Sequence, residues 1–167
     1  MSRPDPLPHF ARLAAALAAE DQPAAGFAAL DAALGAAIGH RLFTILLHDA
    51  AAGFNARVYS NQPAAYPLGG RKPITDSGWM QQVIRDGRPW IGQDYADVQW
   101  AFFDHELIRS LGCESALNLP VRWRGRTLGT LNLLHQAGWY AEPDAAIGSV
   151  IAGLAVPVLL AATLPPG

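Results

Sequence analysis

Residues 115–135 read SALNLPVRWRGRTLGTLNLLH, two apolar runs joined by a short polar connection. Each run has the length of a β-strand and the connection at residues 122–126 contains one glycine, so the stretch predicts a β-hairpin. Asn118 and Asn132 lie inside the apolar runs, where strand propensity disfavours asparagine. Pro120 cannot donate a hydrogen bond to a neighbouring strand, so we expect an edge or a bulge there. Polar side chains placed in such a hairpin indicate a binding surface.

The chain before the hairpin changes from helical to strand patterns. Residues 10–19 and 24–38 are rich in alanine and predict two helices. Residues 42–48 are almost wholly apolar and predict a central strand covered on both faces. Residues 54–60 alternate in polarity and predict a second strand. Its predicted faces carry Phe54, Ala56 and Val58 on one side and Asn55, Arg57 and Tyr59 on the other.

The middle of the chain predicts several short elements. A helix is expected around residues 76–85, followed by the sequence DGRP at residues 86–89 and a short strand near Trp90. Residues 92–102 read as irregular. Another helix is expected to end at residues 110–112, directly before the hairpin, and a last helix follows the hairpin.

Three segments carry a family resemblance beyond this order of elements. They are WM at residues 79–80 with DGRPWI at 86–91, LGCESALNLPV at 111–121, and GRTLGTLNL at 125–133. Together they resemble the GAF domain, over roughly residues 23–162, and leave residues 1–22 as an N-terminal extension with a helix. The resemblance implies an α/β (α+β) fold. Its central antiparallel sheet would have the terminal helices on one face and a helix-loop ligand pocket on the other.

The composition is that of one ordered domain. The chain has 167 residues, of which 51% are hydrophobic and 16% charged, which excludes a disordered protein. The formal net charge is −2 and Lys72 is the only lysine, so nucleic acid is not an expected partner. The single cysteine, Cys113, cannot form an internal disulfide, and the N-terminus has no apolar signal segment. We therefore expect a cytoplasmic location.

Residues 145–164 contain no charge over twenty positions, the length of a membrane span. They are mostly small, include Pro157, and have no basic residue after them. The resemblance implies a helix here that packs on the sheet and often lies in a dimer seam. We expect no membrane insertion, and we expect a homodimer formed through this helix and the helix at 24–38.

No sequence motif supports a metal or a covalent cofactor. Residues 105–109, HELIR, begin like a zinc-protease helix, but Arg109 stands where the second histidine ligand is needed. Phytochrome-like GAF domains attach a bilin through a cysteine, and the resemblance places Phe103 at that position. The identity of any ligand stays open, and neither a metal nor a covalent bilin is expected.

Cys113 bears on the possibility of catalysis. Free-methionine-sulfoxide reductases of the GAF fold need two or three cysteines, because one thiol attacks and another resolves the product as a disulfide. One cysteine cannot complete that cycle internally, and a buried structural thiol is expected. The alternative is a redox enzyme related to these reductases that uses Cys113 with an external thiol.

The predicted pocket lies between one sheet face and residues 76–112. Strand alternation places Leu128, Thr130, Asn132 and Leu134 on one face of the second hairpin strand. The candidate ligand-binding residues are Asn118, Thr130, Asn132 and Asp104, with Trp79, Tyr95, Trp100 and Phe103 as apolar walls.

These residues predict a small-molecule-binding sensory or regulatory module without catalytic activity, which signals through dimer or partner contacts. Its expected ligand is an unidentified small molecule. The other interpretation is a structural dimerisation domain, in which the asparagines bond neighbouring backbone and the aromatic side chains fill the core.

Overall fold

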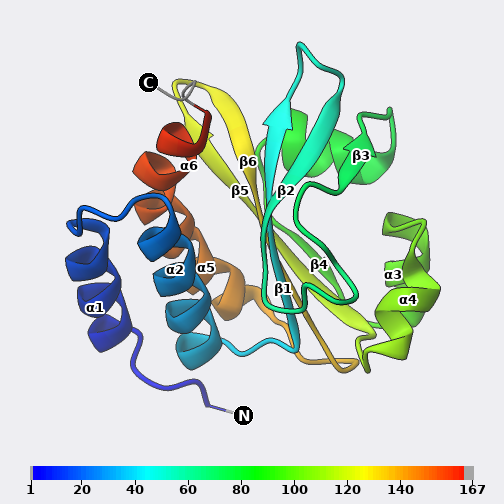
Figure 1. Cartoon of the computed structure of the whole chain (residues 1–167). Helices are drawn as coiled ribbons and strands as arrows, with labels where there is room; N and C mark the ends of the chain where they lie inside the picture. The colour runs from blue at the N-terminus through cyan, green and yellow to red at the C-terminus, as the bar shows by residue number, and fades with distance from the viewer. Residues whose placement is uncertain (1, 164–167) are drawn as a thin grey trace.

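The computed structural model describes residues 2–163. One antiparallel sheet has the strand order β3-β2-β1-β6-β5-β4 (Figure 1). The strands are β1 (Leu42–Asp49), β2 (Phe54–Ser60), β3 (Arg71–Pro73), β4 (Trp90–Gly92), β5 (Ser115–Trp123) and β6 (Arg126–His135). The helices are α1 (Leu7–Leu17), α2 (Ala24–Ala37), the π-helix η1 (Met80–Arg85), α3 (Tyr95–Ala101), α4 (His105–Ser110), α5 (Glu142–Leu154) and α6 (Val156–Thr163).

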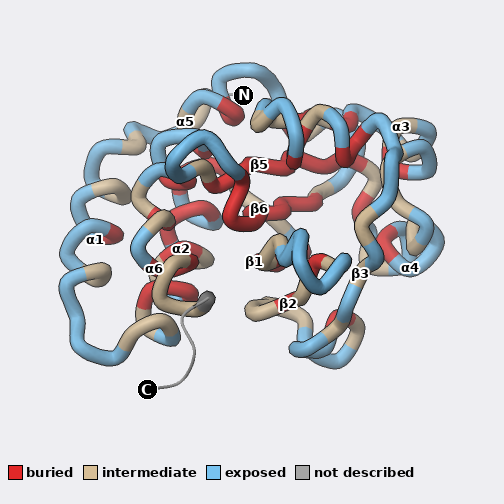
Figure 2. The backbone as a smooth tube through the Cα atoms, turned by 90° about the horizontal axis from the view of Figure 1, so that it is seen from above, coloured by how far each residue is buried: buried red, intermediate tan, exposed pale blue. Residues whose placement is uncertain are grey.

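The molecule has three layers. The terminal helices α1, α2, α5 and α6 lie on one side of the sheet, and α3 and α4 lie on the other (Figure 1). Phe43, Ile45 and Leu131 point from the sheet into the helical layer and are fully buried. The central strands are buried along most of their length (Figure 2). The predicted fold, an antiparallel sheet with the terminal helices on one face, is confirmed.

Gly129 on β6 is required by close packing. A Cβ at this position would collide with the carbonyl oxygen of Leu46 on β1 and lie 2.9 Å from Cδ2 of Leu159 on α6. Gly129 therefore allows β6, β1 and the helical layer to approach closely at one point.

Two β-bulges correct the predicted strand faces. Ile45 pairs with Tyr59 while Leu46 pairs with Arg57, so Val58 is an extra residue. Tyr59 consequently joins the helix side, where its hydroxyl donates to Asp31 of α2 at 2.5 Å. The prediction that Tyr59 shares a face with Asn55 and Arg57 is wrong because strand alternation is interrupted at this bulge.

The second bulge lies in the hairpin. Val121 pairs with Gly129 and Arg122 with Thr127, which leaves Leu128 extra. Leu128 belongs to the buried cluster on the helix side, so the prediction that it shares a face with Asn132 is also wrong.

The hairpin turn is tighter than predicted. The strands extend to Trp123 and from Arg126, so only Arg124 and Gly125 form the turn. Their φ angles of 50° and 75° are those of a type I′ turn, whose twist matches that of the strands. β4 pairs only with residues 116–118 of β5, so Pro120 lies on a free edge as predicted.

Two expected segments differ from the structure. Residues 92–102 contain the helix α3, because the Asp94 side chain caps it by accepting from the Asp97 amide at 3.0 Å. The uncharged stretch at 145–164 lies in two helices, α5 and α6, which are bent by 51°; Leu164 lies outside the described residues. In the described chain no single helix is long and apolar enough to cross a membrane, and this bent pair meets the length and composition criteria only when taken together.

Candidate functional site

A cavity of about 250 Å³ lies between the sheet and the segments on the side opposite the terminal helices. Strands β1, β2, β5 and β6 form its floor, and η1, β3 and the chain from Ala101 to Ile108 form its walls. The lining residues are Leu42, Thr44, Leu46, Asn55, Arg57, Tyr66, Lys72, Pro73, Thr75, Ser77, Trp79, Met80, Ala101, Phe102, Phe103, Asp104, Ile108, Asn118, Asn132 and Leu134. The surface of the cavity is mostly apolar, although ten of these twenty residues are polar. Seven of the ten form two groups, and Asn55, Thr75 and Ser77 lie apart from these groups, beside η1.

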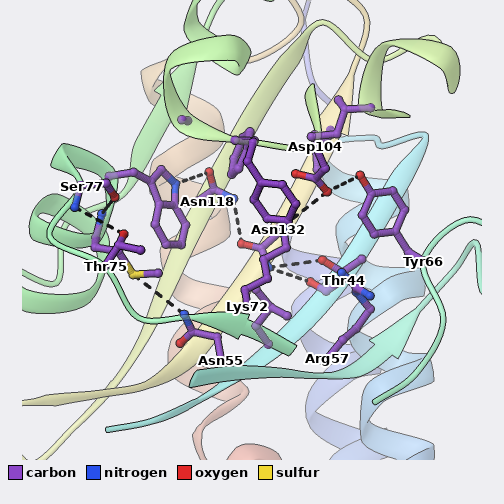
Figure 3. Close-up of a pocket in the computed structure, with 18 of the residues that line it drawn as sticks. Thr44, Asn55, Arg57, Tyr66, Lys72, Thr75, Ser77, Asp104, Asn118 and Asn132 are labelled. Atoms are coloured by element: carbon purple, nitrogen blue, oxygen red, sulfur yellow. Dashed lines mark hydrogen bonds and ion pairs between the residues drawn. The ribbon is translucent and has the colours of Figure 1, made fainter. Parts of the chain in front are cut away.

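The first polar group is a chain of side-chain hydrogen bonds across the floor (Figure 3). The indole Nε1 of Trp79 can only donate, and it lies 3.0 Å from Oδ1 of Asn118. This fixes the Asn118 amide, whose Nδ2 donates to Oδ1 of Asn132 at 2.7 Å. Nδ2 of Asn132 then reaches the carbonyl and hydroxyl oxygens of Thr44, both at 3.4 Å. The two asparagines are thus bonded to protein groups on a buried floor.

The second polar group lies toward β2 and β3. Tyr66 donates its hydroxyl proton to Oδ2 of Asp104 at 2.7 Å, and Lys72 Nζ lies 3.6 Å from the same oxygen (Figure 3). The guanidinium of Arg57 packs over the Tyr66 ring at 4.8 Å and donates to the carbonyl of Pro67 at 3.0 Å. Arg57 Nε and Asp104 Oδ1 are buried and have no hydrogen-bond partner among residues 2–163. We call Arg57, Tyr66, Lys72 and Asp104 the charged cluster.

Burial controls the ionisation of this cluster. Desolvation lowers the pKa of Lys72, and Arg57 lowers it further, while Asp104 opposes both effects. Desolvation also lowers the pKa of Arg57, against the attraction of Tyr66 and Asp104. The pKa of Tyr66 is raised, first by burial and then by its hydrogen bond to Asp104. The shifts of Lys72 and Arg57 indicate cations whose charge the protein compensates only in part, whereas the shift of Tyr66 keeps its hydroxyl neutral.

Five of the eight predicted site residues line the cavity: Trp79, Phe103, Asp104, Asn118 and Asn132. Thr130 is buried at 2% exposure but does not line it. Tyr95 and Trp100 also lie outside the cavity lining. The Tyr95 hydroxyl lies 2.8 Å from Nδ1 of His105, and Trp100 is 60% exposed and stacks on Trp90 at 5.9 Å.

The sequence interpretation missed Arg57, Tyr66 and Lys72. Alternation did place Asn55 and Arg57 on one face, and Lys72 is opposite Asn55 in the β2–β3 pairing. Gly70 was a further signal, since a Cβ there would collide with Nη1 of Arg57. Tyr66 lies in a loop, where no periodic pattern indicates its direction.

Cys113 is separate from this cavity. Its side chain is fully buried in the core beside α4 and is not among the lining residues. Burial raises the pKa of the thiol to about 11, against the opposing effect of Arg41. A thiol in this environment is a poor nucleophile at neutral pH.

The family model described as GAF domain matches residues 21–159, which is most of the chain. The protein therefore belongs to the GAF domain family. No match was found among proteins with curated descriptions.

Solved structures, two of them of GAF domains, share this fold over almost the whole chain. The GAF domain of a phosphoenolpyruvate-protein phosphotransferase from Coxiella burnetii has a TM-score of 0.75 at 15% identity, with 94% of each chain covered. The corresponding domain from Acinetobacter has a TM-score of 0.76 at 12% identity, with 96% of each chain covered. Free methionine-R-sulfoxide reductase from Neisseria meningitidis, in complex with its substrate, has a TM-score of 0.74 at 21% identity, covering 96% of this chain and 94% of that one.

Proposed function

We propose that this protein is a small-molecule-binding sensory or regulatory GAF module whose ligand occupies the cavity between the sheet and residues 75–108. The observation that carries the proposal is a pair of buried polar atoms without partners, Arg57 Nε and Asp104 Oδ1. Both residues line an otherwise mainly apolar cavity. A polar ligand would supply the missing partners, since unpaired buried polar groups are costly.

The asparagine pair has a supporting role in this proposal. Asn118 and Asn132 are bonded to each other, to Trp79 and to Thr44, so they shape the floor. The ligand would then contact the charged cluster directly and lie over the buried asparagine floor. This assigns specificity to Arg57, Lys72 and Asp104.

Signalling is proposed to pass through a homodimer or a partner that contacts the terminal helices. The exposed residues of α2 are small and uncharged: Ala24, Ala28, Ala32, Gly35 and Ala36. On α5, Val150 is 49% exposed. Such a surface can approach another helix closely. A cytoplasmic setting fits the single, reduced Cys113.

The redox alternative has less support. A protein of the same fold from Neisseria meningitidis is a free methionine-R-sulfoxide reductase, but the identity of 21% extends the likeness only to the fold. In this chain Cys113 is fully buried, does not line the cavity and has a raised pKa. Our proposal therefore contains no catalytic step.

A thermal-shift screen with a library of small metabolites tests the proposal. Ala101 lines the cavity from the end of α3, whereas Gln99 is exposed on the same helix. Compounds that stabilise the wild-type protein should fail to stabilise Ala101→Trp and should still stabilise Gln99→Trp. Stabilisation that survives in both variants would place the ligand elsewhere and contradict the proposal.

A further inference from the structure

We infer that the ligand of this cavity is a small organic carboxylate, with its carboxylate between Arg57 and Lys72 and its apolar body over the asparagine floor. This inference rests on the proposed function and adds the chemical class of the ligand. It follows from the charge, the unused donors and the dimensions of the cavity.

The charge of the lining favours an anion. Arg57 and Lys72 are cationic and Asp104 is anionic, so two positive charges and one negative charge leave one net positive charge among the lining residues. Oδ2 of Asp104 already accepts from Tyr66 and lies near Lys72, whereas Oδ1 has no partner in the described chain and would accept from a donor elsewhere on the ligand, not from its carboxylate. A single carboxylate on the ligand would balance the remaining charge, whereas an ammonium ion would add to it.

The unused donors match a carboxylate in particular. Nη1 of Arg57 is occupied by the carbonyl of Pro67, while its Nε–H is buried without a partner. The Nε edge of a guanidinium is one of the edges that can hold a carboxylate with two parallel hydrogen bonds. Lys72 Nζ, at 3.6 Å from Asp104, lies beyond hydrogen-bond length from that oxygen and can turn a donor to a ligand.

The desolvation of both cations supports the same conclusion. Burial lowers the pKa of Lys72 and of Arg57, which means that their positive charges are incompletely compensated by the protein. An anion between them would restore the missing compensation without moving Asp104 from Tyr66.

The remainder of the cavity sets the size and the character of the ligand. About 250 Å³ is slightly smaller than the range of about 300–1,000 Å³ typical of drug-sized ligands, which favours a small metabolite. Trp79, Met80 and Phe102 form apolar walls. A short aliphatic or aromatic body therefore fits beside the carboxylate.

Calorimetric titration of the full chain with five matched probes tests this inference. The probes are 3-phenylpropionate, 3-phenylpropionamide and 3-phenylpropylamine, with hexanoate and hexanamide as an aliphatic pair. We expect the carboxylates to bind at least about tenfold more tightly than the amides and the amine, because only the carboxylates carry a negative charge that both cations attract.

Lys72→Met removes one of the two cations and should weaken carboxylate binding by about tenfold or more. Arg71→Met is the matched control, because it removes the same charge from the neighbouring residue of β3. Arg71 is exposed, packs over the Phe54 ring and does not line the cavity. It should bind the carboxylates as the wild type does. Urea unfolding of each variant establishes that both are folded.

Three results would overturn the inference. Equal or tighter binding of an amide or the amine would refute the carboxylate and still uphold a small-molecule cavity. Equal losses in Lys72→Met and Arg71→Met would show a general effect of charge. Absence of binding by every probe would refute the carboxylate as the ligand class. The proposed function would be refuted as well only if the metabolite screen found no compound whose binding Ala101→Trp abolishes.

Discussion

Asn118 and Asn132 are joined side chain to side chain on the buried floor of the cavity. Their direction is set from one end, because the indole of Trp79 can only donate and therefore turns the oxygen of Asn118 toward itself. Each later amide in the chain is oriented by the one before it. A substitution at either asparagine thus affects a connected set of buried groups rather than one bond.

We expect Asn132→Leu to destabilise the protein. The change removes the acceptor of Asn118 Nδ2 and leaves that donor buried without a partner, at a cost of about 1–3 kcal/mol. The melting temperature should fall by several degrees in a thermal scan, while the exposed control Gln99→Leu should stay within about 0.5 kcal/mol of wild type. An unchanged or higher melting temperature would mean that the asparagine pair does not stabilise the fold and serves ligand binding instead.

Cys113 is expected to support no sulfoxide reduction. Its pKa of about 11 keeps nearly all of the thiol protonated at neutral pH, and its side chain is fully buried. Methionine sulfoxide supplied with a dithiol or with thioredoxin should give no turnover that depends on this residue. Turnover in the wild type that disappears in Cys113→Ser would establish the redox alternative instead.

The sequence predicted the hairpin half of the cavity better than the rest. Asn118 and Asn132 were recognisable as polar residues in apolar strands, and their facing positions follow from the hairpin. Lys72 enters the cavity because β3 returns to β2 after a loop, and no local pattern fixes that return. Arg57 lay on a predicted face of β2, but the pattern of that strand did not indicate that this face lines the cavity. Tyr95 and Trp100 were predicted to line the cavity because they are aromatic. The aromatic character of a residue does not indicate where its side chain points, and α3 directs these two away from the cavity lining.

At the scale of elements, the bounds of β1 and β2 were predictable to within one residue, whereas the short strand β3 and the bulges were not. The residues of β2 occupy the predicted range exactly, yet Val58 breaks its alternation. A bulge depends on the fit between two strands, so a single strand pattern cannot reveal it. The same reason explains the misassigned face of Leu128 on β6.

The close approach at Gly129 makes a testable element-scale prediction. In Gly129→Ala the new methyl group would collide with the backbone of β1, so we expect a loss of roughly 1–3 kcal/mol in urea unfolding. Gly153→Ala on α5 is the matched control, because nothing lies within 4 Å of its Cβ position. It should instead gain about 0.5–1 kcal/mol through helix propensity. Equal stabilities for the two variants would show that β6 can move away from β1 without cost.

At the scale of the whole molecule, the helical layer is expected to form a homodimer. Light scattering at micromolar concentration should report about twice the 17.8 kDa of one chain. The physical reason is the outer surface of α2 and α5, on which Glu142 at the start of α5 is the only exposed charged residue among the described residues of these two helices. Water covers such a surface less favourably than a second copy would.

The dimer prediction has matched variants on opposite sides of the molecule. Val150→Glu places a charge on the outer face of α5 and should give a monomer, whereas Leu107→Glu on α4 should leave the mass unchanged. A monomeric wild type, or equal effects of the two substitutions, would contradict an interface through the terminal helices.

The bulge at Val58 also concerns how this chain can be aligned with its relatives. Removing one residue from an ordinary strand exchanges the faces of everything beyond the gap. Removing Val58 would instead leave the faces of the flanking residues unchanged. Arg57 and Tyr59 already point to opposite sides of the sheet, as neighbouring residues of a regular strand do. Relatives of this fold can therefore lack a residue here and keep the same cavity and the same helix contacts. When such a relative is aligned with this chain, a gap at Val58 inside β2, rather than in the flanking loops, would bring equivalent positions into register.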